Sequence, residues 1–350
     1  MTPQPLQERI AQAAAAGRAL RLRGGGTKDF YGGELRGEVL DVRGYRGIVS
    51  YEATELVVTA RCGTPLAELE AELAAHGQCL PFEPPHFGEG ATFGGCIAAG
   101  LSGPRRAAAG AVRDFVLGAT VIDGRGRLLS FGGQVMKNVA GYDVSRLMAG
   151  SLGTLALIAE ASVKVLPRPQ REQTLRLELA ESRALEALNG WAGQPLPISA
   201  SVWEAGVLTV RLSGAESAVR AAACKLGGGE LAPAAPFWDA IRDQRAPFFS
   251  GSEPLWRLSV PSTAAALALP GRQLIEWGGA LRWLKSDAAA GAVREATKRA
   301  GGHATLFRGG VRSEGIFAPL DAVQLRLHRE LKAAFDPAGI LNPGRLYPEL

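Results

Sequence analysis

Runs of glycine dominate the parts of this sequence in which binding chemistry is concentrated. The first run, Arg23-Gly24-Gly25-Gly26-Thr27-Lys28, directly follows a short strand-like stretch. Three glycines allow backbone N–H groups to converge on a phosphate without obstruction, so a side chain at Gly25 is expected to fill the phosphate site. A Rossmann or Walker loop needs a following helix, whereas residues 29–33 have no helical period. A phosphate-binding loop of another type and a plain turn are equal alternatives.

A second run of small residues spans Gly90–Gly100. Small residues let a large flat group lie directly against the backbone, and a close-packed helix start is the alternative interpretation. Arg113 and Asp114 follow, either as ligand contacts or as a surface ion pair of little energetic value.

A third polar stretch, residues 136–143, contains Lys137, Asn138 and Tyr142, and it precedes a Gly153-Thr154 step. A lysine in such a place can stabilise negative charge that develops on a reduced cofactor ring. A helix with polar caps is the alternative. Each motif alone is weakly specific, but their order and spacing together favour one ligand-binding region.

Composition excludes several functional classes. The net charge is +5 over 350 residues, but the basic residues are scattered and do not alternate with aromatics, so nucleic-acid binding is not expected. Cys62, Cys79, Cys96 and Cys224 form no CxxC pair, so neither an iron–sulfur cluster nor structural zinc is expected. The sequence shows no signal peptide and no membrane span, which predicts a cytoplasmic protein.

The first half of the chain predicts strands separated by helices and glycine-rich loops. A helix is expected to begin with Thr64 as N-cap and Pro65 at its first position. Residues 81–113 lack a steady period and are expected to form a long loop around a ligand. The other expected elements are a helix at 5–17, strands at 19–23, 38–42 and 55–60, a hairpin of 116–122 with 128–131, and an alternating strand at 155–165.

The second half predicts a different arrangement. Two loose ββα units between 171 and 310 suggest an antiparallel sheet with helices on one face. A helix near 323–331 ends before Asp336-Pro337. We therefore expect an α+β fold divided into a ligand-binding domain (1–169), a smaller α+β cap domain (170–310) that contacts substrate or a partner, and a helical tail that returns to the first domain (311–350).

Taken together, these motifs resemble the vanillyl-alcohol oxidase, or PCMH-type, FAD-binding domain, which has two subdomains. The matching stretches are 24–28, 90–100 and 153–160, and the resemblance covers about residues 1–169. It implies FAD as cofactor, with the diphosphate on the first loop and the isoalloxazine on the second. The implied FAD-binding residues are Arg23, Gly24, Gly25, Gly26, Thr27, Lys28, Pro85, Gly90, Ala91, Thr92, Gly94, Gly95, Ala98, Arg113, Asp114, Lys137, Asn138, Tyr142, Gly153, Thr154, Ile158 and Glu160.

A closer resemblance, to the FAD-binding subunits of bacterial glycolate oxidases, runs almost end to end. It is carried by stretches 40–43, 46–49, 83–86, 101–106, 131–148, 247–249, 278–285, 301–305 and 342–345. It implies oxidation of a small 2-hydroxy acid, glycolate, to glyoxylate, within a complex that includes a larger flavin subunit and an iron–sulfur subunit. The cysteine count agrees, because onward electron transfer would use a partner's cluster. Any membrane association would be peripheral, at the inner face, through these partners.

Histidine usage separates this sequence from parts of that family. Some members attach FAD through a histidine in the first loop, where Thr27 and Lys28 stand here, so non-covalent FAD is expected. The four histidines include no pair with metal-ligand spacing, and no metal is expected. His303 is the candidate general base, with a structural hydrogen-bond partner as the alternative. Arg308 or Arg282 is the candidate carboxylate clamp, with a solvated arginine as the alternative, and Arg105 and Arg106 are further candidates. The alternative roles are a non-catalytic electron-transfer or scaffolding flavoprotein and, less favoured, an assembly protein without FAD.

Overall fold

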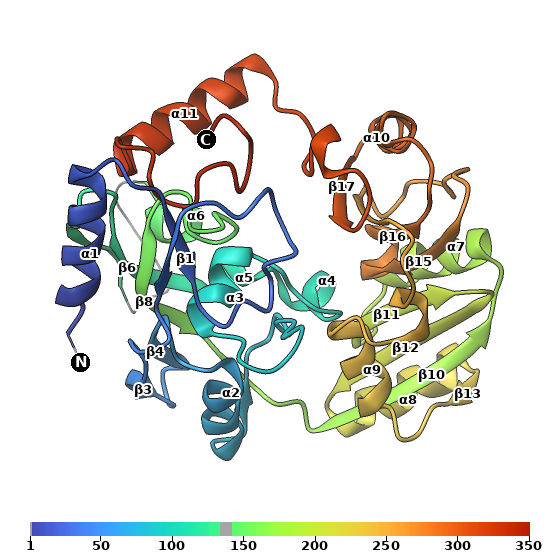
Figure 1. The fold of residues 1–350 in the computed structure, drawn as a ribbon. Helices are drawn as coiled ribbons and strands as arrows, with labels where there is room; N and C mark the ends of the chain where they lie inside the picture. Colours follow the sequence, from blue (N-terminus) through green and yellow to red (C-terminus); the bar gives the residue numbers. More distant parts are fainter. Residues whose placement is uncertain (1, 134–141) are drawn as a thin grey trace. The chain divides into compact units, whose positions relative to one another are not determined.

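A computed structural model describes residues 2–133 and 142–350, which fall into two compact units (Figure 1). The first unit draws on residues 1–102, 111–167 and 319–350, and the second on 103–110 and 168–318. The chain therefore enters the second unit briefly at 103–110 and comes back to the first unit at its C-terminal end. The expected three-part division at 169 and 310 stays a prediction.

An antiparallel sheet in the order β3-β4-β8-β6-β7 forms the centre of the first unit. The predicted hairpin is confirmed, and Asp123 in its turn accepts hydrogen bonds from the N–H groups of Arg125 and Arg127, both at 2.9 Å. The predicted alternating strand is β8, which is mostly buried on both faces because it is a central strand. The strands are β3 (Ile48–Glu52), β4 (Val57–Arg61), β6 (Val116–Ile122), β7 (Leu128–Gly132) and β8 (Leu157–Lys164).

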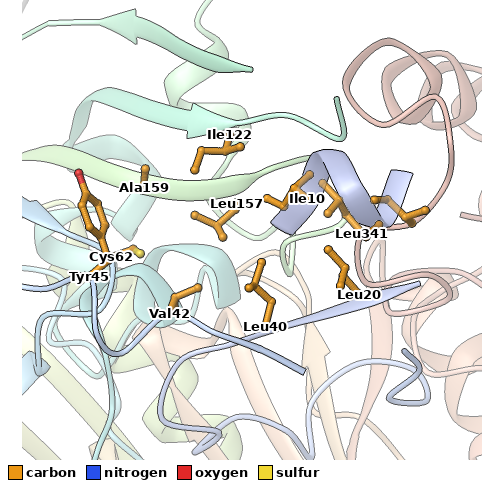
Figure 2. Close-up of a cluster of buried hydrophobic side chains, with 12 residues drawn as sticks. Ile10, Leu20, Leu40, Val42, Tyr45, Cys62, Ile122, Leu157, Ala159 and Leu341 are labelled. Carbon is orange, nitrogen blue, oxygen red and sulfur yellow. The ribbon is translucent and has the colours of Figure 1, made fainter. Parts of the chain in front are cut away.

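A second, parallel pair carries the glycine loop. It consists of β1 (Leu20–Arg23) and β2 (Glu38–Asp41), and Leu341 from the C-terminal segment bridges to Leu20 beside them. Buried side chains of α1 (Gln4–Ala15), β1, β2, β6, β8 and the C-terminal segment form one hydrophobic cluster, including Ile10, Leu20 and Leu157 (Figure 2). The loop that follows β1 therefore starts from a strand fixed on both sides.

Helices and short strands complete the first unit. They are α2 (Leu66–Ala75), α3 (Phe93–Ala99), α5 (Val112–Phe115), α6 (Val144–Leu147), α11 (Ala322–Phe335), β5 (Gln78–Cys79) and β9 (Leu166–Pro167). The predicted role of Thr64 is wrong, because Pro65 is the N-cap of α2 and the Thr64 hydroxyl accepts from the Gly47 N–H at 2.9 Å. The expected loop 81–113 instead contains α3, the start of α5 and, in the second unit, α4 (Arg106–Ala109). These three helices are too short to show a helical period in the sequence.

The second unit contains the predicted antiparallel sheet, in the order β13-β10-β12-β11-β15-β16-β14-β17. Its strands are β10 (Arg171–Glu178), β11 (Ile198–Glu204), β12 (Val207–Gly214), β13 (Gly229–Glu230), β14 (Leu255–Ser259), β15 (Arg272–Glu276), β16 (Leu281–Lys285) and β17 (His303–Arg308). The helices α7 (Glu181–Ala192) and α8 (Glu216–Leu226) pack against one half of the sheet, and α10 (Ala290–Arg299) packs against the other half.

One helix departs from the expectation that helices cover a single face. Trp238 of α9 (Ala235–Arg242) donates its indole N–H to Thr174 Oγ1 at 2.9 Å. The neighbouring Leu175 belongs to the core under α7 and α8. Successive strand residues point to opposite faces, so α9 lies on the other side of the sheet. Among the described residues, no helix combines the length and apolarity needed to cross a bilayer.

A buried ion pair fixes the returning C-terminal segment. Lys332 Nζ donates to Asp336 Oδ2 at 2.8 Å and to the carbonyls of Thr154 at 2.7 Å and Leu341 at 2.8 Å. Asp336 in turn accepts from the N–H of Leu341 at 2.7 Å. Burial lowers the pKa of Lys332, and the hydrogen bond to Asp336 opposes that shift. The pair thus joins α11, the chain end and the Gly153-Thr154 step.

We predict that Lys332→Met lowers the free energy of unfolding by about 3–5 kcal/mol, because it leaves the Asp336 carboxylate buried without its cation. Urea denaturation followed by circular dichroism measures this change. Arg326→Met is the matched control on the same helix, since Arg326 and Glu330 form an exposed pair 3.8 Å apart, and its effect should stay below about 1 kcal/mol. Equal stability of the two variants would contradict the role given to the buried pair.

Candidate cofactor-binding site

Two adjoining clefts in the first unit meet at the glycine loop. They enclose about 580 and about 410 Å³ of space and both open to solvent. Gly24, Gly95 and Ala98 line both clefts, together with Leu152 and Asn342. Leu22 and Arg23 also line both clefts, so the two clefts share one wall at the start of the glycine loop.

The glycines of the first loop are needed for the loop to pack against residues 90–92, in addition to leaving its backbone uncovered. A Cβ on Gly25 would overlap the carbonyl oxygen of Gly90, and a Cβ on Gly24 would overlap Thr92 Oγ1. The loop backbone therefore lies directly on the 90–92 segment. The expectation that a side chain at Gly25 would fill the phosphate site is wrong, because the Cβ direction points toward Gly90. The loop shape that exposes the backbone depends on this close approach.

Cationic side chains line the first cleft beside that backbone. Arg23 Nε lies 3.3 Å from Asp29 Oδ2, and Arg21 donates to the same carboxylate oxygen. Two guanidinium groups on one carboxylate leave a net positive charge at the loop. Lys28 lies at its far end, with Nζ 3.4 Å from the His86 carbonyl and 5.6 Å from the centre of the Phe87 ring. Exposed amides next to excess positive charge are suited to a diphosphate.

The second cleft is mostly apolar. Val42, Ala156 and Ile158 line it. Gly94 lies against Cys62, and Gly153 lies against the side chains of Asn342 and Leu22. Cys62 also lines it, and burial raises the pKa of this thiol to about 12, so it stays neutral. Glycines and alanines in this wall let a flat ring system lie close to the backbone, and Arg23 is the one charged residue among the described residues that line the cleft.

The C-terminal segment closes the site and was not among the predicted cofactor residues. Asn342 Oδ1 accepts from the Leu22 N–H at 2.7 Å, and its Nδ2 donates to the Leu152 carbonyl at 2.6 Å. Arg345 donates to the carbonyls of Tyr31 and Gly33. Asn342 therefore connects the start of the glycine loop to the wall of the second cleft. The stretch 342–345 carried part of the family resemblance, and that was the signal that could have identified it.

Most of the predicted cofactor residues come together in these clefts. Those that line them are Arg23, Gly24, Gly25, Gly26, Thr27, Lys28, Thr92, Gly94, Gly95, Ala98, Gly153 and Ile158. Lining residues that sequence reasoning missed are Leu22, Asp29, Leu35, Val42, Cys62, Ala99, Leu152, Ala156, Leu157, Asn342 and Arg345. Most of these are apolar, and an apolar side chain carries no motif that distinguishes a cleft wall from a core.

The other predicted cofactor residues are not among the residues that line the clefts. Pro85, Gly90, Ala91, Arg113, Asp114, Tyr142, Thr154 and Glu160 lie in described parts of the chain, whereas Lys137 and Asn138 lie outside the described residues. Gly90 lies against Gly25. The Asp114 carboxylate accepts from the Ala111 N–H at 2.8 Å, and Tyr142 is 96% exposed. Glu160 accepts from the Tyr45 hydroxyl at 2.6 Å. These assignments stay predictions.

The candidate catalytic residues lie in the second unit, on β17. His303 is at the start of that strand and Arg308 at its end, which separates their backbones by roughly 16 Å. Partial desolvation and the nearby Arg257 lower the pKa of His303, which favours a neutral imidazole able to accept a proton. Arg308 donates to Gln244 Oε1 at 3.0 Å. The structure therefore does not bring the predicted base and clamp together around one small molecule.

The alternative arginines are engaged elsewhere. Arg282 is fully buried and donates to the carbonyls of Gly279, Ala264 and Ala265, so its guanidinium supports a loop. Arg105 donates to Glu172 at 2.6 Å. Arg106 lies with its guanidinium carbon 4.4 Å from the centre of the Trp277 ring.

The residues of the two clefts fit a dinucleotide flavin. The first cleft combines the backbone of the glycine loop with excess positive charge, and Cβ atoms at Gly24 or Gly25 would displace that backbone. The adjoining second cleft is mostly apolar. Comparison with known proteins agrees. Residues 2–132 match the FAD binding domain family, and residues 316–346 match the C-terminal domain of FAD linked oxidases. Fold and site thus define a flavoprotein of the FAD-linked oxidase class.

Full-length similarity then assigns the family. Glycolate oxidase subunit GlcE of Escherichia coli strain K12 is 52% identical over 347 residues, covering 99% of this chain and 98% of that protein. The chain belongs to the GlcE family. Glycolate oxidase subunit GlcD of Bacillus subtilis strain 168 is 33% identical over 44% of this chain and 33% of its own length. A solved structure of alkyldihydroxyacetonephosphate synthase has the same fold, with a TM-score of 0.66 at 16% identity over 97% of this chain and 75% of that one.

We predict that Gly25→Ala abolishes stoichiometric FAD binding, because even a methyl group cannot fit against the Gly90 carbonyl and the loop must move. Flavin absorbance per protein after reconstitution measures the loss. Gly44→Ala is the control, since a Cβ there meets nothing within 4 Å, and it should bind FAD like the parent chain. If the folded Gly25→Ala variant retains one FAD per chain, the loop does not form the site.

Proposed function

We propose that this chain is the FAD-binding subunit of a glycolate oxidase and takes part in oxidising glycolate to glyoxylate. The observation that carries the proposal is the 52% identity to the Escherichia coli subunit over nearly the whole of both chains. The cleft adds physical support, because its backbone cradle and cations suit the diphosphate of FAD. The expected cytoplasmic location, with membrane contact only through partners, stays a prediction.

We assign FAD binding and proton transfer to different residues of this chain. The amides of Gly24–Gly26, with Arg23 and Lys28, would bind the diphosphate, and the small residues of α3 and the Gly153 step would lie against the rings. When bound, FAD supplies the acceptor for the hydride removed from the substrate carbon. His303 would take the hydroxyl proton, because its lowered pKa keeps the imidazole neutral. Arg308, the clamp predicted from the sequence, lies at the other end of β17, and we assign it no role.

We further propose that FAD is held without a covalent bond. The first loop itself contains no histidine, although the structure places His86 near it through the contact between its carbonyl and Lys28 Nζ. The His86 ring faces another way, with Nε2 2.8 Å from Glu70 Oε2. The engagement of this imidazole by Glu70 supports non-covalent binding.

We predict that acid precipitation or denaturant releases all flavin from the purified chain, since hydrogen bonds, ion pairs and packing alone would retain it. Absorbance of the supernatant and of the washed pellet measures the partition. Yellow colour that remains in the pellet of the parent chain but disappears in His86→Ala would instead identify a covalent link at that residue.

The proposed partners follow from the family and from the thiols of this chain. A larger flavin subunit of the GlcD type and an iron–sulfur subunit would complete the complex. Cys62 and Cys96 are buried and Cys224 is exposed on α8, and the described residues contain no cluster of three or more metal-binding side chains. Electrons would then leave through a partner's cluster. A non-catalytic electron-transfer or scaffolding role remains the alternative, because His303 and Arg308 lie far apart along β17.

We predict that anaerobic mixing of the FAD-loaded chain with glycolate bleaches the flavin band near its visible maximum, because reduced flavin loses that absorption. Stopped-flow absorbance with and without the larger subunit separates the two roles. Bleaching by the chain alone supports direct oxidation. Bleaching only after the partner is added would transfer the substrate chemistry to that partner, and glycerol in place of glycolate gives the background.

A further inference from the structure

The sheet of the second unit has one face that α10 does not cover. On β14, Trp256 and Leu258 pack in the core beneath α10, so the intervening Arg257 points to the opposite face. Arg257 pairs in register with Thr305 of β17 and with Trp283 of β16, and paired residues share a face. The Arg257 side chain is only partly exposed. A long cation thus lies on the face opposite α10.

A fixed aromatic ring supports this guanidinium. The Arg257 guanidinium carbon lies 5.3 Å from the centre of the Trp277 ring, and that of Arg106 lies 4.4 Å from the same centre. Trp277 is buried, and its indole N–H donates to the Gly103 carbonyl at 3.1 Å. Stacking on an immobile ring restricts the guanidinium and leaves its edge N–H groups free to donate.

Within the described part of the chain, the Arg257 guanidinium has no hydrogen-bond or ion-pair partner, whereas Lys285 of β16 and Arg105 at the start of α4 each have one. Lys285 is 2.7 Å from Glu253, and Arg105 is 2.6 Å from Glu172. The buried carboxylate of Glu276, next to Trp277, accepts from the Trp283 indole N–H at 2.7 Å. Arg257 is therefore equipped for a carboxylate that comes from outside the chain.

His303 lies beside this cation. Its register partner is Ser259, two residues beyond Arg257 on β14. A residue and its diagonal neighbour across an antiparallel pair are separated by roughly 7–8 Å, within reach of long side chains. The influence of Arg257 on the pKa of His303 agrees with this proximity. By contrast, Arg308 is five residues further along β17 and already donates to Gln244.

We propose that Arg257, stacked on Trp277, binds the carboxylate of the small 2-hydroxy acid, with His303 next to the hydroxyl on the adjacent carbon. A 2-hydroxy acid carries its carboxylate and hydroxyl on neighbouring carbons, which matches a cation and a neutral base that are diagonal neighbours on one sheet face. The inference rests on the proposed function and gives the carboxylate a different partner from the predicted Arg308. The neutral cavity of about 900 Å³ near Trp277, lined by Trp191, Ser199 and Ser201 among others, does not provide such a cation.

Equilibrium binding of glycolate to the full FAD-loaded chain tests the proposal. The flavin is reduced beforehand with dithionite under anaerobic conditions, so that glycolate cannot be oxidised during calorimetric titration. Arg257→Gln should raise the Kd for glycolate by about 10- to 100-fold, the range for a lost hydrogen bond to a charged group. Arg257→Lys keeps the positive charge but loses the paired N–H donors of the guanidinium, and it should raise the Kd by less. Glycolamide, which has no carboxylate, should bind the parent chain and both variants alike.

A matched control variant and a separate flavin measurement distinguish failure of the Arg257 proposal from failure of the proposed oxidation. Arg176→Gln removes another guanidinium of the same sheet, which lies 5.7 Å from the centre of the Phe237 ring of α9, and should leave the Kd unchanged. An unchanged Kd in Arg257→Gln, with FAD content and circular dichroism intact, overturns the inference. Failure of the parent chain to bind glycolate also overturns it. Failure of the proposed oxidation appears instead as unbleached flavin in the oxidised parent chain, with or without its partner.

Discussion

The cleft in the first unit depends on the return of the chain end to its beginning. Lys332 and Asp336 form a buried ion pair that also binds backbone groups of Leu341 and Thr154, and this fixes the path of the last residues. Asn342 then satisfies the Leu22 N–H and the Leu152 carbonyl. Three segments that are distant in sequence thereby become the walls of one site.

Within that frame, the absence of side chains determines the shape of the site. Glycine at position 25 allows the first loop to lie on the Gly90 carbonyl, and glycine at 94 allows α3 to approach the backbone of Cys62. These approaches leave the loop backbone beside Arg23 and Lys28 and let glycines and alanines line much of the neighbouring, mostly apolar cleft. A charged diphosphate and flat rings need these two environments next to each other, and the FAD-linked family to which the chain belongs supplies the matching cofactor.

The second unit uses its arginines in two different ways. Arg282 and Arg105 are engaged by carbonyls or carboxylates of the chain and stabilise loops and strand edges. Arg257 is stacked on Trp277 and keeps donors for an external anion. A sheet that presents one such cation beside a neutral His303 has the chemistry to recognise a small hydroxy acid. The same sheet is a stable platform, because large apolar cores pack under α7, α8 and α10.

The sequence by itself determined the features that depend on local chemistry. Alternation revealed β8, the Asp-Gly turn revealed the β6–β7 hairpin, and the glycine runs located most of the cleft. Tertiary structure alone decided the rest. The partners of Asn342 lie up to 320 residues away, and no periodic pattern encodes such a contact. The same holds for the approach of His86 to Lys28, the direction of Gly25 toward Gly90 and the stacking of Arg257 on Trp277. Each depends on which segments become neighbours after folding, whereas a motif reports only what lies beside it along the chain.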